Sequence, residues 1–421
     1  MTVEVLSLGC RLNISESEQL RGLLAGCDDV IVVNSCAVTS EAVRQTRQTI
    51  RRARKARPEA RLLVTGCAAE IERDMLAAMP EVDGLVPNAT KLDPKGYLPF
   101  SARPEPVEGP SLSSGPDASP EGEKQAFDKL SAGGSFLSAT HSRGFVQVQN
   151  GCDHACTFCV IPQGRGPSRS RKVGAVLEDV SRHLDAGAGE IVLTGVDLTS
   201  WGDDLPGVPR LGALVAAILG AFPNLQRLRL SSVDGAEVDA ELFELVAGES
   251  RLMPHLHLSL QSGDDMILKR MKRRHSRRDA ILLVERLRAR RADLSIGADI
   301  IAGFPTEDEA MHANSLAIVT ELGVVHGHVF PYSPRPGTPA ARMPQVDPVR
   351  AKARAAELRA AIAGQRRSWL TGLIGQPLRV LAERDGTGHA ENFAPVRLPP
   401  HTPARALLTL VPQALIEGTL A

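Results

Sequence analysis

Residues 145–162 read FVQVQNGCDHACTFCVIP. A strand-like run is followed directly by a loop that places Cys152, Cys156 and Cys159 in a C-x3-C-x2-C arrangement. Three thiolates on one short loop can face a single metal centre, and three ligands leave a four-iron cluster with one open iron. A structural zinc site needs a fourth ligand, which His154 could supply, so a zinc knuckle is the alternative interpretation. The position just past a strand favours the cluster.

The chain from this loop onward alternates between strand-like and helical stretches. The strand-like runs are FVQVQ (145–149), EIVLTG (190–195), RLRLSS (227–232), HLHLSLQ (255–261), SIGADIIAGF (295–304) and HGHVFPY (326–332). Helical stretches are predicted near 173–187, 210–221, 238–248, 276–291 and 308–322. Six such units form an incomplete version of the eight-unit barrel, whose chemistry lies at the carboxyl ends of the strands. A further helix over 348–370 precedes short runs up to Leu420 that predict a small antiparallel β module.

The first 98 residues show the same alternation on a smaller scale. Strands are predicted at VEVLSL, VIVVN and RLLVT with a fourth near 82–86, and helices at 15–25, 41–57 and 69–79. This pattern predicts a small parallel, doubly wound sheet. Cys10, Cys36 and Cys67 each follow one of these strands. Strand ends line the ligand-binding edge of such a sheet, so we expect the three thiols to converge there, although each alone could be a buried apolar residue.

Composition narrows the class of protein. The 421 residues are 43% hydrophobic, and 49 basic residues balance 49 acidic ones, which excludes a uniformly cationic, histone-like protein. An odd number of cysteines (seven, with Cys27 assigned to structure) and the lack of an export signal argue against a disulfide framework, and the cytoplasm is the expected location. Seventeen of the 24 residues in 101–124 are Ser, Pro, Gly or Glu, so 99–142 is predicted to be a disordered linker.

The cysteine loop resembles the radical S-adenosylmethionine superfamily, whose signature is C-x3-C-x-aromatic-C with Phe158 at the aromatic place. In that superfamily the open iron binds S-adenosylmethionine, and one-electron cleavage gives a 5′-deoxyadenosyl radical. LTGVD (193–197), SLQSG (259–263) and DIIAGFPTE (299–307) resemble later segments that line the cofactor. The resemblance therefore assigns Phe158, Gly195, Gln261 and Asp299 to S-adenosylmethionine binding.

Two three-cysteine sets and a C-terminal β module together resemble the radical methylthiotransferases. LGCRLN (8–13) and HVFPYSPRPGTPAARMPQV (328–346) are most similar to the branch that acts on threonylcarbamoyladenosine of tRNA. KRMKRRHS resembles that branch's M-x-R-x-Y-T segment, with Arg273 at the arginine and His275 at the tyrosine, and AENF (390–393) resembles a TRAM domain. The implied fold is an N-terminal doubly wound sheet (1–98), a linker (99–142), a partial (β/α)6 radical barrel (143–370) and a TRAM-like RNA-binding module (371–421).

The same resemblance implies the activity. The enzyme would replace the C2 hydrogen of threonylcarbamoylated adenosine, 3′-adjacent to the anticodon, with a methylthio group. Cys152, Cys156 and Cys159 would carry a radical 4Fe-4S cluster, and Cys10, Cys36 and Cys67 an auxiliary 4Fe-4S cluster that accepts the sulfur to be transferred. S-adenosylmethionine would serve as methyl donor and as radical source.

Basic clusters at 41–57, 164–172 and 269–278 fit a tRNA anticodon stem-loop as partner, although a solvated helix face explains any one of them. An electron donor such as flavodoxin or ferredoxin and a sulfur donor are further expected partners, and no membrane is expected. Aromatic residues make up 3% of the chain, and none is assigned to holding the adenine. The alternatives are isopentenyladenosine tRNA or a ribosomal protein aspartate as substrate, and a non-catalytic, zinc-dependent RNA-binding protein.

Overall fold

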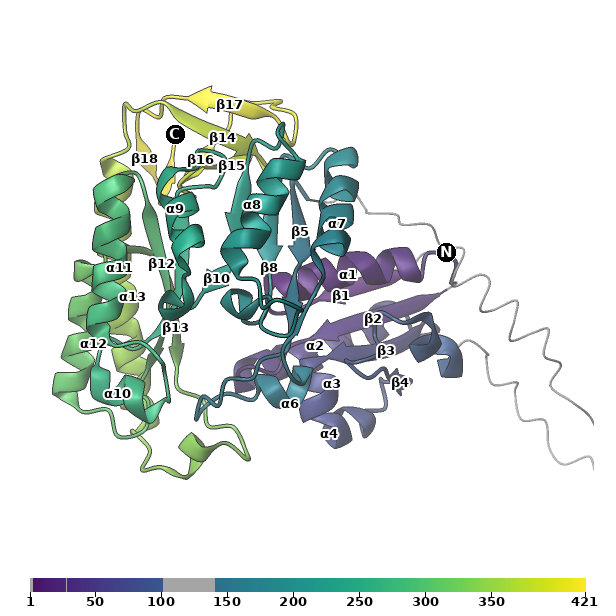
Figure 1. Ribbon diagram of the computed structural model, residues 1–421. Coiled ribbons are helices and arrows are strands. Elements are labelled where there is room, and N and C mark those ends of the chain that lie inside the picture. Colours follow the sequence, from purple (N-terminus) through teal and green to yellow (C-terminus); the bar gives the residue numbers. More distant parts are fainter. Residues whose placement is uncertain (1–2, 28, 101–140) are drawn as a thin grey trace, which may run out of the picture. The chain divides into compact units, whose positions relative to one another are not determined.

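A computed structural model describes residues 3–27, 29–100 and 141–421 (Figure 1). Its contacts divide the chain into two units, Met1–Ser138 with Gln163–Gly166, and Ala139–Pro162 with Pro167–Ala421. Apart from its two ends, the predicted linker 99–142 lies outside the described residues. No helix in the described ranges combines the length and the apolar character that crossing a membrane requires.

The first unit contains the predicted parallel sheet, with strand order β1-β2-β3-β4. Its strands are β1 (Glu4–Ser7), β2 (Val30–Ser35), β3 (Arg61–Gly66) and β4 (Gly84–Leu85). Its helices are α1 (Arg11–Leu23), α2 (Ser40–Ala56), α3 (Cys67–Ile71), α4 (Arg73–Ala77) and the 3-10 helix η1 (Pro94–Phe100). Separate apolar cores cover the two faces, with Leu20 of α1 in one and Ile50 of α2 in the other. The single helix predicted at 69–79 is wrong, because the chain leaves helical geometry at Glu72 (φ −114°).

The second unit carries the predicted barrel strands. They are β5 (Arg143–Gln147), β8 (Glu190–Thr194), β9 (Leu228–Leu230), β10 (Ser232–Val233), β11 (His255–Gln261), β12 (Ser295–Ala302) and β13 (Val324–Pro331). They form two parallel sheets, β5-β8-β9 and β10-β11-β12-β13, so the third predicted strand is split in two at Ser231. A short antiparallel pair, β6 (Gln149–Asn150) and β7 (Arg169–Ser170), flanks the cysteine loop.

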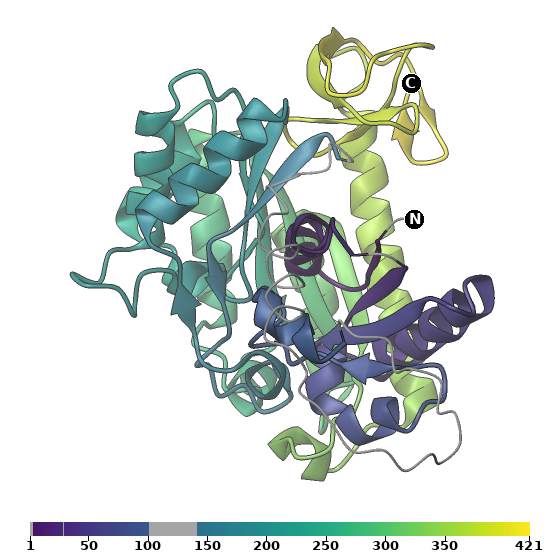
Figure 2. The same ribbon diagram turned by 90° about the vertical axis from the view of Figure 1, so that its right-hand side faces the viewer.

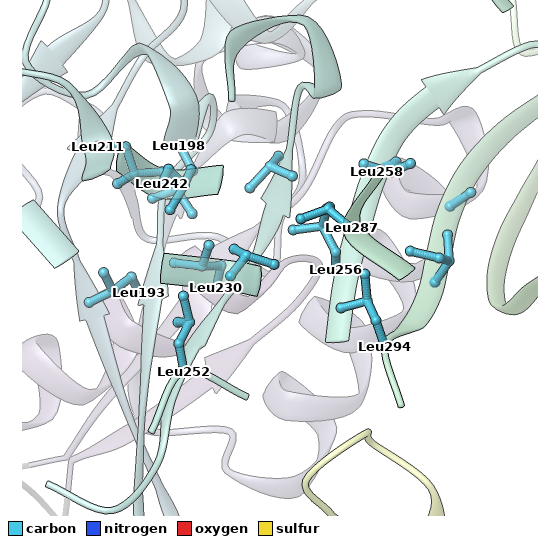
Figure 3. Packing of buried hydrophobic residues seen from close by; sticks show 14 of the residues in the cluster. Leu193, Leu198, Leu211, Leu230, Leu242, Leu252, Leu256, Leu258, Leu287 and Leu294 are labelled. Atoms are coloured by element: carbon cyan, nitrogen blue, oxygen red, sulfur yellow. The ribbon is translucent and has the colours of Figure 1, made fainter. Parts of the chain in front are cut away.

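Helices cover the outer face of these sheets (Figure 1). Those with residues in the apolar cluster behind the sheets are α7 (Val173–Asp185), η2 (Leu198–Ser200), α8 (Leu211–Ala221), α9 (Ala240–Gly248), α11 (Arg277–Arg290), α12 (Glu309–Glu321) and α13 (Pro348–Thr371). The other helices between residues 161 and 342 are α6 (Ile161–Arg165), which ends within the first unit, η3 (Gly235–Glu237), α10 (Asp265–Arg270) and η4 (Pro339–Arg342). Strand alternation explains the core: Leu256 and Leu258 of β11 pack with Leu287 of α11 in the largest apolar cluster (Figure 3). The residues that alternate with them in β11, His255 and His257, face the other side of the sheet.

The C-terminal module is a six-stranded sheet with order β17-β14-β15-β16-β19-β18. Its strands are β14 (Leu378–Ala382), β15 (Thr387–Ala390), β16 (Pro395–Arg397), β17 (Leu407–Leu410), β18 (Leu415–Ile416) and β19 (Thr419–Leu420). The expectation of a purely antiparallel module is wrong, since β16 and β19 pair in parallel. Figure 2 shows α13 running up to this module, where Leu370 and Trp369 join its core.

Candidate functional site

The first cysteine set lies on the loop between β6 and α6. Backbone N–H groups of His154 and Ile161 donate to the Sγ atoms of Cys152 and Cys159, both at 3.4 Å. Burial raises the pKa of Cys159 to about 12, and the neighbouring Cys156 and Cys152 thiolates add to this rise. The structure thus brings the three thiols of this set within electrostatic range of one another.

Charged side chains surround this loop. Arg273 Nη1 lies 3.6 Å from Cys156 Sγ, and Arg273 Nη2 lies 2.7 Å from Asp234 Oδ2. His154 Nε2 lies 2.9 Å from Asp197 Oδ2, and this hydrogen bond is the largest cause that raises the pKa of His154 to about 12. Ligand atoms of Cys152, His154 and Asp197 lie within 4.8 Å of one another, so the donors of the alternative zinc site also meet here. Three thiols on one loop are the donor set that a 4Fe-4S cluster with one open iron takes.

Of the residues assigned to S-adenosylmethionine, Phe158 lies on the cysteine loop, whereas Gly195 and Gln261 lie at strand ends. Phe158 packs edge to face with Phe304, with ring centroids 6.3 Å apart. A Cβ atom on Gly195 would come within 3.0 Å of Gln149 Oε1, so glycine permits this close approach. Gln261 ends β11 with a positive φ of 69°, which is uncommon for a residue with a side chain.

Asp299, the fourth of these residues, lies on β12. Its Oδ1 atom is 3.1 Å from His257 Nε2 and 3.0 Å from His328 Nδ1. The four cofactor assignments stay predictions.

The second cysteine set lies where the sequence places it. Cys36 and Cys67 directly follow β2 and β3, and Cys10 comes three residues after the end of β1. Burial raises the pKa of Cys36 to about 11, with further contributions from Cys67 and Cys10. Gly9, at φ +93°, permits this packing, because a Cβ atom there would lie 2.9 Å from Cys36 Sγ. Cys27 is partly buried against the apolar core on the α1 face, which agrees with its structural assignment.

A buried polar network beside the second set was not predicted. Asn13 Nδ2 donates to Leu8 O at 2.6 Å and to Ser35 O at 3.1 Å, so it joins the chain preceding Cys10 and Cys36. Arg165 contacts Asn13 Oδ1 at 2.5 Å and Glu16 Oε1 at 2.8 Å.

Glu16 also binds Lys91 at 2.5 Å. Assigning Arg165 to RNA as part of 164–172 is therefore wrong for this residue, whose side chain is 2% exposed. Its acidic partner is 149 residues away in sequence, so no local signal marks it.

Only part of each predicted basic cluster is available to a phosphate. Five cations of α2 are exposed: Arg44, Arg47, Arg51, Arg52 and Lys55. Two of them have surface partners, because Arg44 binds Glu41 at 2.6 Å and Arg51 lies 3.6 Å from Glu81. Arg54 and Arg57 of the same segment bind Asp83 and Asp29. In 269–278 the exposed cations are Lys269, Lys272, Arg274 and Arg278.

Two family models match this chain. The Radical SAM superfamily matches residues 146–317, and the Uncharacterized protein family UPF0004 matches residues 2–87. The threonylcarbamoyladenosine tRNA methylthiotransferase MtaB of Rickettsia prowazekii is 46% identical over 397 residues, which cover 94% of this chain and 91% of that protein. The chain belongs to the radical SAM methylthiotransferase family.

Two further comparisons agree. The tRNA-2-methylthio-N(6)-dimethylallyladenosine synthase of Erythrobacter litoralis is 32% identical, over 91% of this chain and 87% of that protein. The solved structure of the radical S-adenosylmethionine methyltransferase TsrM from Kitasatospora setae, with cobalamin and a 4Fe-4S cluster, matches with a TM-score of 0.51 and 15% identity. It covers 77% of this chain and 66% of that one, and this likeness concerns the fold alone. Membership of the radical SAM methylthiotransferases implies S-adenosylmethionine and a 4Fe-4S cluster.

Proposed function

We propose that this methylthiotransferase acts on N6-threonylcarbamoyladenosine of tRNA, 3′-adjacent to the anticodon, and converts it to the 2-methylthio derivative. The observation that carries the proposal is the pair of three-cysteine sets, one on the loop between β6 and α6 and the other just past the ends of the parallel strands β1, β2 and β3. The choice of substrate rests on the relatives: identity is 46% to the protein named for threonylcarbamoyladenosine and 32% to the one named for dimethylallyladenosine.

Cys152, Cys156 and Cys159 are the proposed ligands of the radical cluster. Three thiolates leave one iron open for S-adenosylmethionine, with Phe158, Gly195, Gln261 and Asp299 as candidate contacts. Burial raises the pKa of Cys152 to about 11, and because a cluster ligand must be a thiolate, binding of the cluster would release the proton of this thiol. Burial also acts on Cys156, but His154 and Arg273 outweigh it and lower the pKa of that thiol.

Cys10, Cys36 and Cys67 are the proposed ligands of an auxiliary cluster. Asn13 links the two chain segments that lead into Cys10 and Cys36, and thereby fixes their spacing. Arg165 places a buried positive charge near the three thiols, which offsets the negative charge of three thiolates. When bound, the two clusters and S-adenosylmethionine supply the radical that removes hydrogen from adenine C2 and the sulfur and methyl group that replace it.

The exposed cations of α2 and of 269–278 are the proposed contacts to the phosphates of the tRNA anticodon stem-loop. The TRAM-like module is a second proposed RNA contact. A flavodoxin or ferredoxin as electron donor and a separate sulfur donor complete the proposed set of partners.

The test removes each cysteine set in turn and measures iron, S-adenosylmethionine cleavage and modified nucleosides. Reconstituted protein should hold about eight irons, in two four-iron clusters. Replacing Cys152, Cys156 and Cys159 by Ala should halve the iron and abolish cleavage. Replacing Cys10, Cys36 and Cys67 should also halve the iron, retain cleavage to 5′-deoxyadenosine, and abolish methylthiolation. Cys27→Ala is the matched control and should match the parent in all three measurements.

Four outcomes would contradict the proposal. Cleavage that survives loss of the first set would remove the radical assignment. Full methylthiolation without the second set would make those cysteines structural residues. Nucleoside mass spectrometry of a complemented deletion strain tests the substrate, and a methylthio group on isopentenyladenosine or on a ribosomal protein would change it. Zinc without iron would favour the non-catalytic RNA-binding alternative.

A further inference from the structure

The inner face of β13 presents two exposed rings. β13 is the terminal strand of its sheet among the described residues. Val324 and Val329 belong to the apolar core behind the sheet. On the opposite face, the His328 side chain is 64% exposed and Phe330 is 40% exposed. Within the described ranges, Phe330 is the only aromatic residue among the exposed large hydrophobic side chains.

Exposure of an aromatic ring on a rigid strand has a cost. A phenylalanine ring left in water forgoes the stabilisation that burial gives to a large apolar side chain. Phe304 of the same unit is fully buried, so the fold does accommodate phenylalanine in its interior. An exposed ring next to polar groups is the arrangement that proteins use to stack an unpaired nucleic-acid base.

A polar cluster lies directly beside Phe330. Asp299 and His328 are cross-strand partners between β12 and β13, and His257 comes from β11 on the other side. Asp299 Oδ1 lies 3.1 Å from one histidine nitrogen and 3.0 Å from the other. The strand register therefore fixes this cluster before any ligand arrives.

The charge state and open atoms of the cluster suit a polar ligand. Burial acts to raise the pKa of Asp299, but hydrogen bonds from His257 and His328 hold it well below its usual range. The contact of His328 to Asp299 uses Nδ1, so Nε2 of this largely exposed ring is available to a ligand. Ring centroids of His328 and Phe330 are 6.4 Å apart, so one nucleoside can contact both.

The N6 group of the proposed substrate matches this chemistry. A threonylcarbamoyl group carries urea N–H and C=O groups, a hydroxyl and a carboxylate, whereas a dimethylallyl group carries carbon and hydrogen alone. Covering a charged, hydrogen-bonding cluster with a hydrocarbon leaves its polar atoms unpaired. Sites built to hydrogen-bond a substrate reject analogues that lack the polar atoms far more strongly than apolar sites reject extra groups.

We propose that the inner face of β13 is the binding site of the target nucleoside, where Phe330 stacks on the adenine and His328, oriented by Asp299, binds its polar N6 group. This inference rests on the proposed function and deepens it. An adenosine must leave the stacked anticodon loop to reach an enzyme interior, and a stacking ring compensates for part of that cost. Phe330 and His328 are then positioning and specificity residues.

The experiment compares anticodon stem-loops that carry threonylcarbamoyladenosine or plain adenosine at the same position. Anaerobically reconstituted protein is titrated into each labelled loop, and the dissociation constants are measured by fluorescence anisotropy. Phe330→Ala should weaken binding of both loops about ten- to hundredfold, and Phe330→Trp should restore it. His328→Ala should remove the preference for the modified loop and leave affinity for the plain loop unchanged. Val349→Ala, at a 75% exposed position on α13, is the control and should behave like the parent.

Iron content and thermal unfolding of each variant check that the fold is intact. Equal affinity of Phe330→Ala and Val349→Ala for both loops would overturn the stacking site. A preference that survives His328→Ala would overturn the N6 contact.

The nitrogen and oxygen atoms of the cluster lie within 4.8 Å of one another, so a cation is the competing ligand. If chelator-treated parent protein prefers the modified loop only after Mn²⁺ is added, the cluster is a metal site and the direct contact is wrong. Parent protein without any preference would overturn both the proposed substrate and this inference, whereas a preference retained in both variants would overturn the inference alone.

Discussion

Glu190→Gln is the substitution that tests most directly how the barrel and the C-terminal module are joined. Glu190, on β8, is fully buried and accepts hydrogen bonds from three arginines. Its Oε1 atom accepts from Arg143 Nε at 2.9 Å and Arg229 Nε at 2.8 Å. Its Oε2 atom accepts from Arg227 Nε at 2.8 Å and Arg229 Nη2 at 3.0 Å. Arg227 and Arg229 also donate to backbone carbonyls of the C-terminal module. The Glu190 carboxylate therefore neutralises the arginine charges at the contact between barrel and module, which we call the joint.

The expected loss in the free energy of unfolding follows from the hydrogen bonds and charges that remain in Glu190→Gln. Glutamine keeps one acceptor oxygen, while its NH2 group faces guanidinium N–H donors, so two of the four hydrogen bonds are lost. Arg227 and Arg229, both 0% exposed at the side chain, keep their charges without a counterion. Breaking a buried pair in this way costs about 3–5 kcal/mol. We expect the lower end, near 3 kcal/mol, because the carbonyls of the module still accept from both arginines.

The chain has two tryptophans, so removing one leaves a fluorescence signal that reports on a single part of the protein. In a Trp201→Phe background, fluorescence reports Trp369 alone, which packs against the core of the C-terminal module. Urea unfolding followed at Trp369 should show a lower midpoint for Glu190→Gln. The control is Glu391→Gln, whose carboxylate lies 3.3 Å from Arg379 with side chains 31% and 50% exposed, and which should cost less than about 1 kcal/mol. Equal losses of unfolding free energy in Glu190→Gln and Glu391→Gln would refute the claim that Glu190 stabilises the joint.

The pH dependence provides a second check. Burial alone would raise the pKa of Glu190, but Arg229, Arg143 and Arg227 outweigh it and hold the pKa well below its ordinary value of 4.5. A carboxylate with a lowered folded pKa stabilises the protein above its unfolded pKa, and this stabilisation is lost as the pH falls toward the folded pKa. The difference between parent and Glu190→Gln should therefore be constant from about pH 5 to 8 and shrink below about pH 4.5.

Two further substitutions test the cysteine sites. Gly9→Ala should lower iron content by about half and retain S-adenosylmethionine cleavage, because the added Cβ would lie 2.9 Å from Cys36 Sγ at a backbone φ of +93°. Gly220→Ala, where no atom lies within 4 Å of the added Cβ, is its control, and full iron in Gly9→Ala would contradict the packing argument. Asp234→Asn should slow S-adenosylmethionine cleavage about tenfold, since it releases Arg273 from its position 3.6 Å from Cys156 Sγ. An unchanged cleavage rate would show that Arg273 does not depend on Asp234.

The positions of the six cysteines could be predicted from sequence because their signals are local. A short apolar run sets each strand, and the residue after the run lies at the strand's carboxyl end. β11 spans His255–Gln261 as predicted, and the predicted ends of α7, α8, α11, α12 and α13 lie within two residues of those observed. Element type and sheet edge follow from such runs without knowledge of the tertiary contacts.

Which charged side chains are buried could not be predicted, because their burial depends on partners far away in sequence. Arg165 and Arg273 stand in basic runs that indicate a solvated surface. The fold instead buries the first against Glu16, 149 residues away, and the second against Asp234, 39 residues away. Similarly, nothing in β11 alone shows that His257 meets Asp299 of β12 and His328 of β13. Long-range pairing, not local preference, decides which charged residues serve the interior.

One strand pattern accounts for both the joint and the proposed nucleoside site. Alternate residues of the barrel strands point inward, and here they are charged or aromatic: Arg229 on β9, His257 on β11 and His328 on β13. At Arg229 the C-terminal module covers the interior, with the ring centroid of Phe393 4.8 Å from its guanidinium carbon. At His328 nothing comparable covers the described structure, and the side chain is 64% exposed. The same inward-facing chemistry therefore stabilises the joint where it is covered, and it is free to bind a polar substrate where it is exposed.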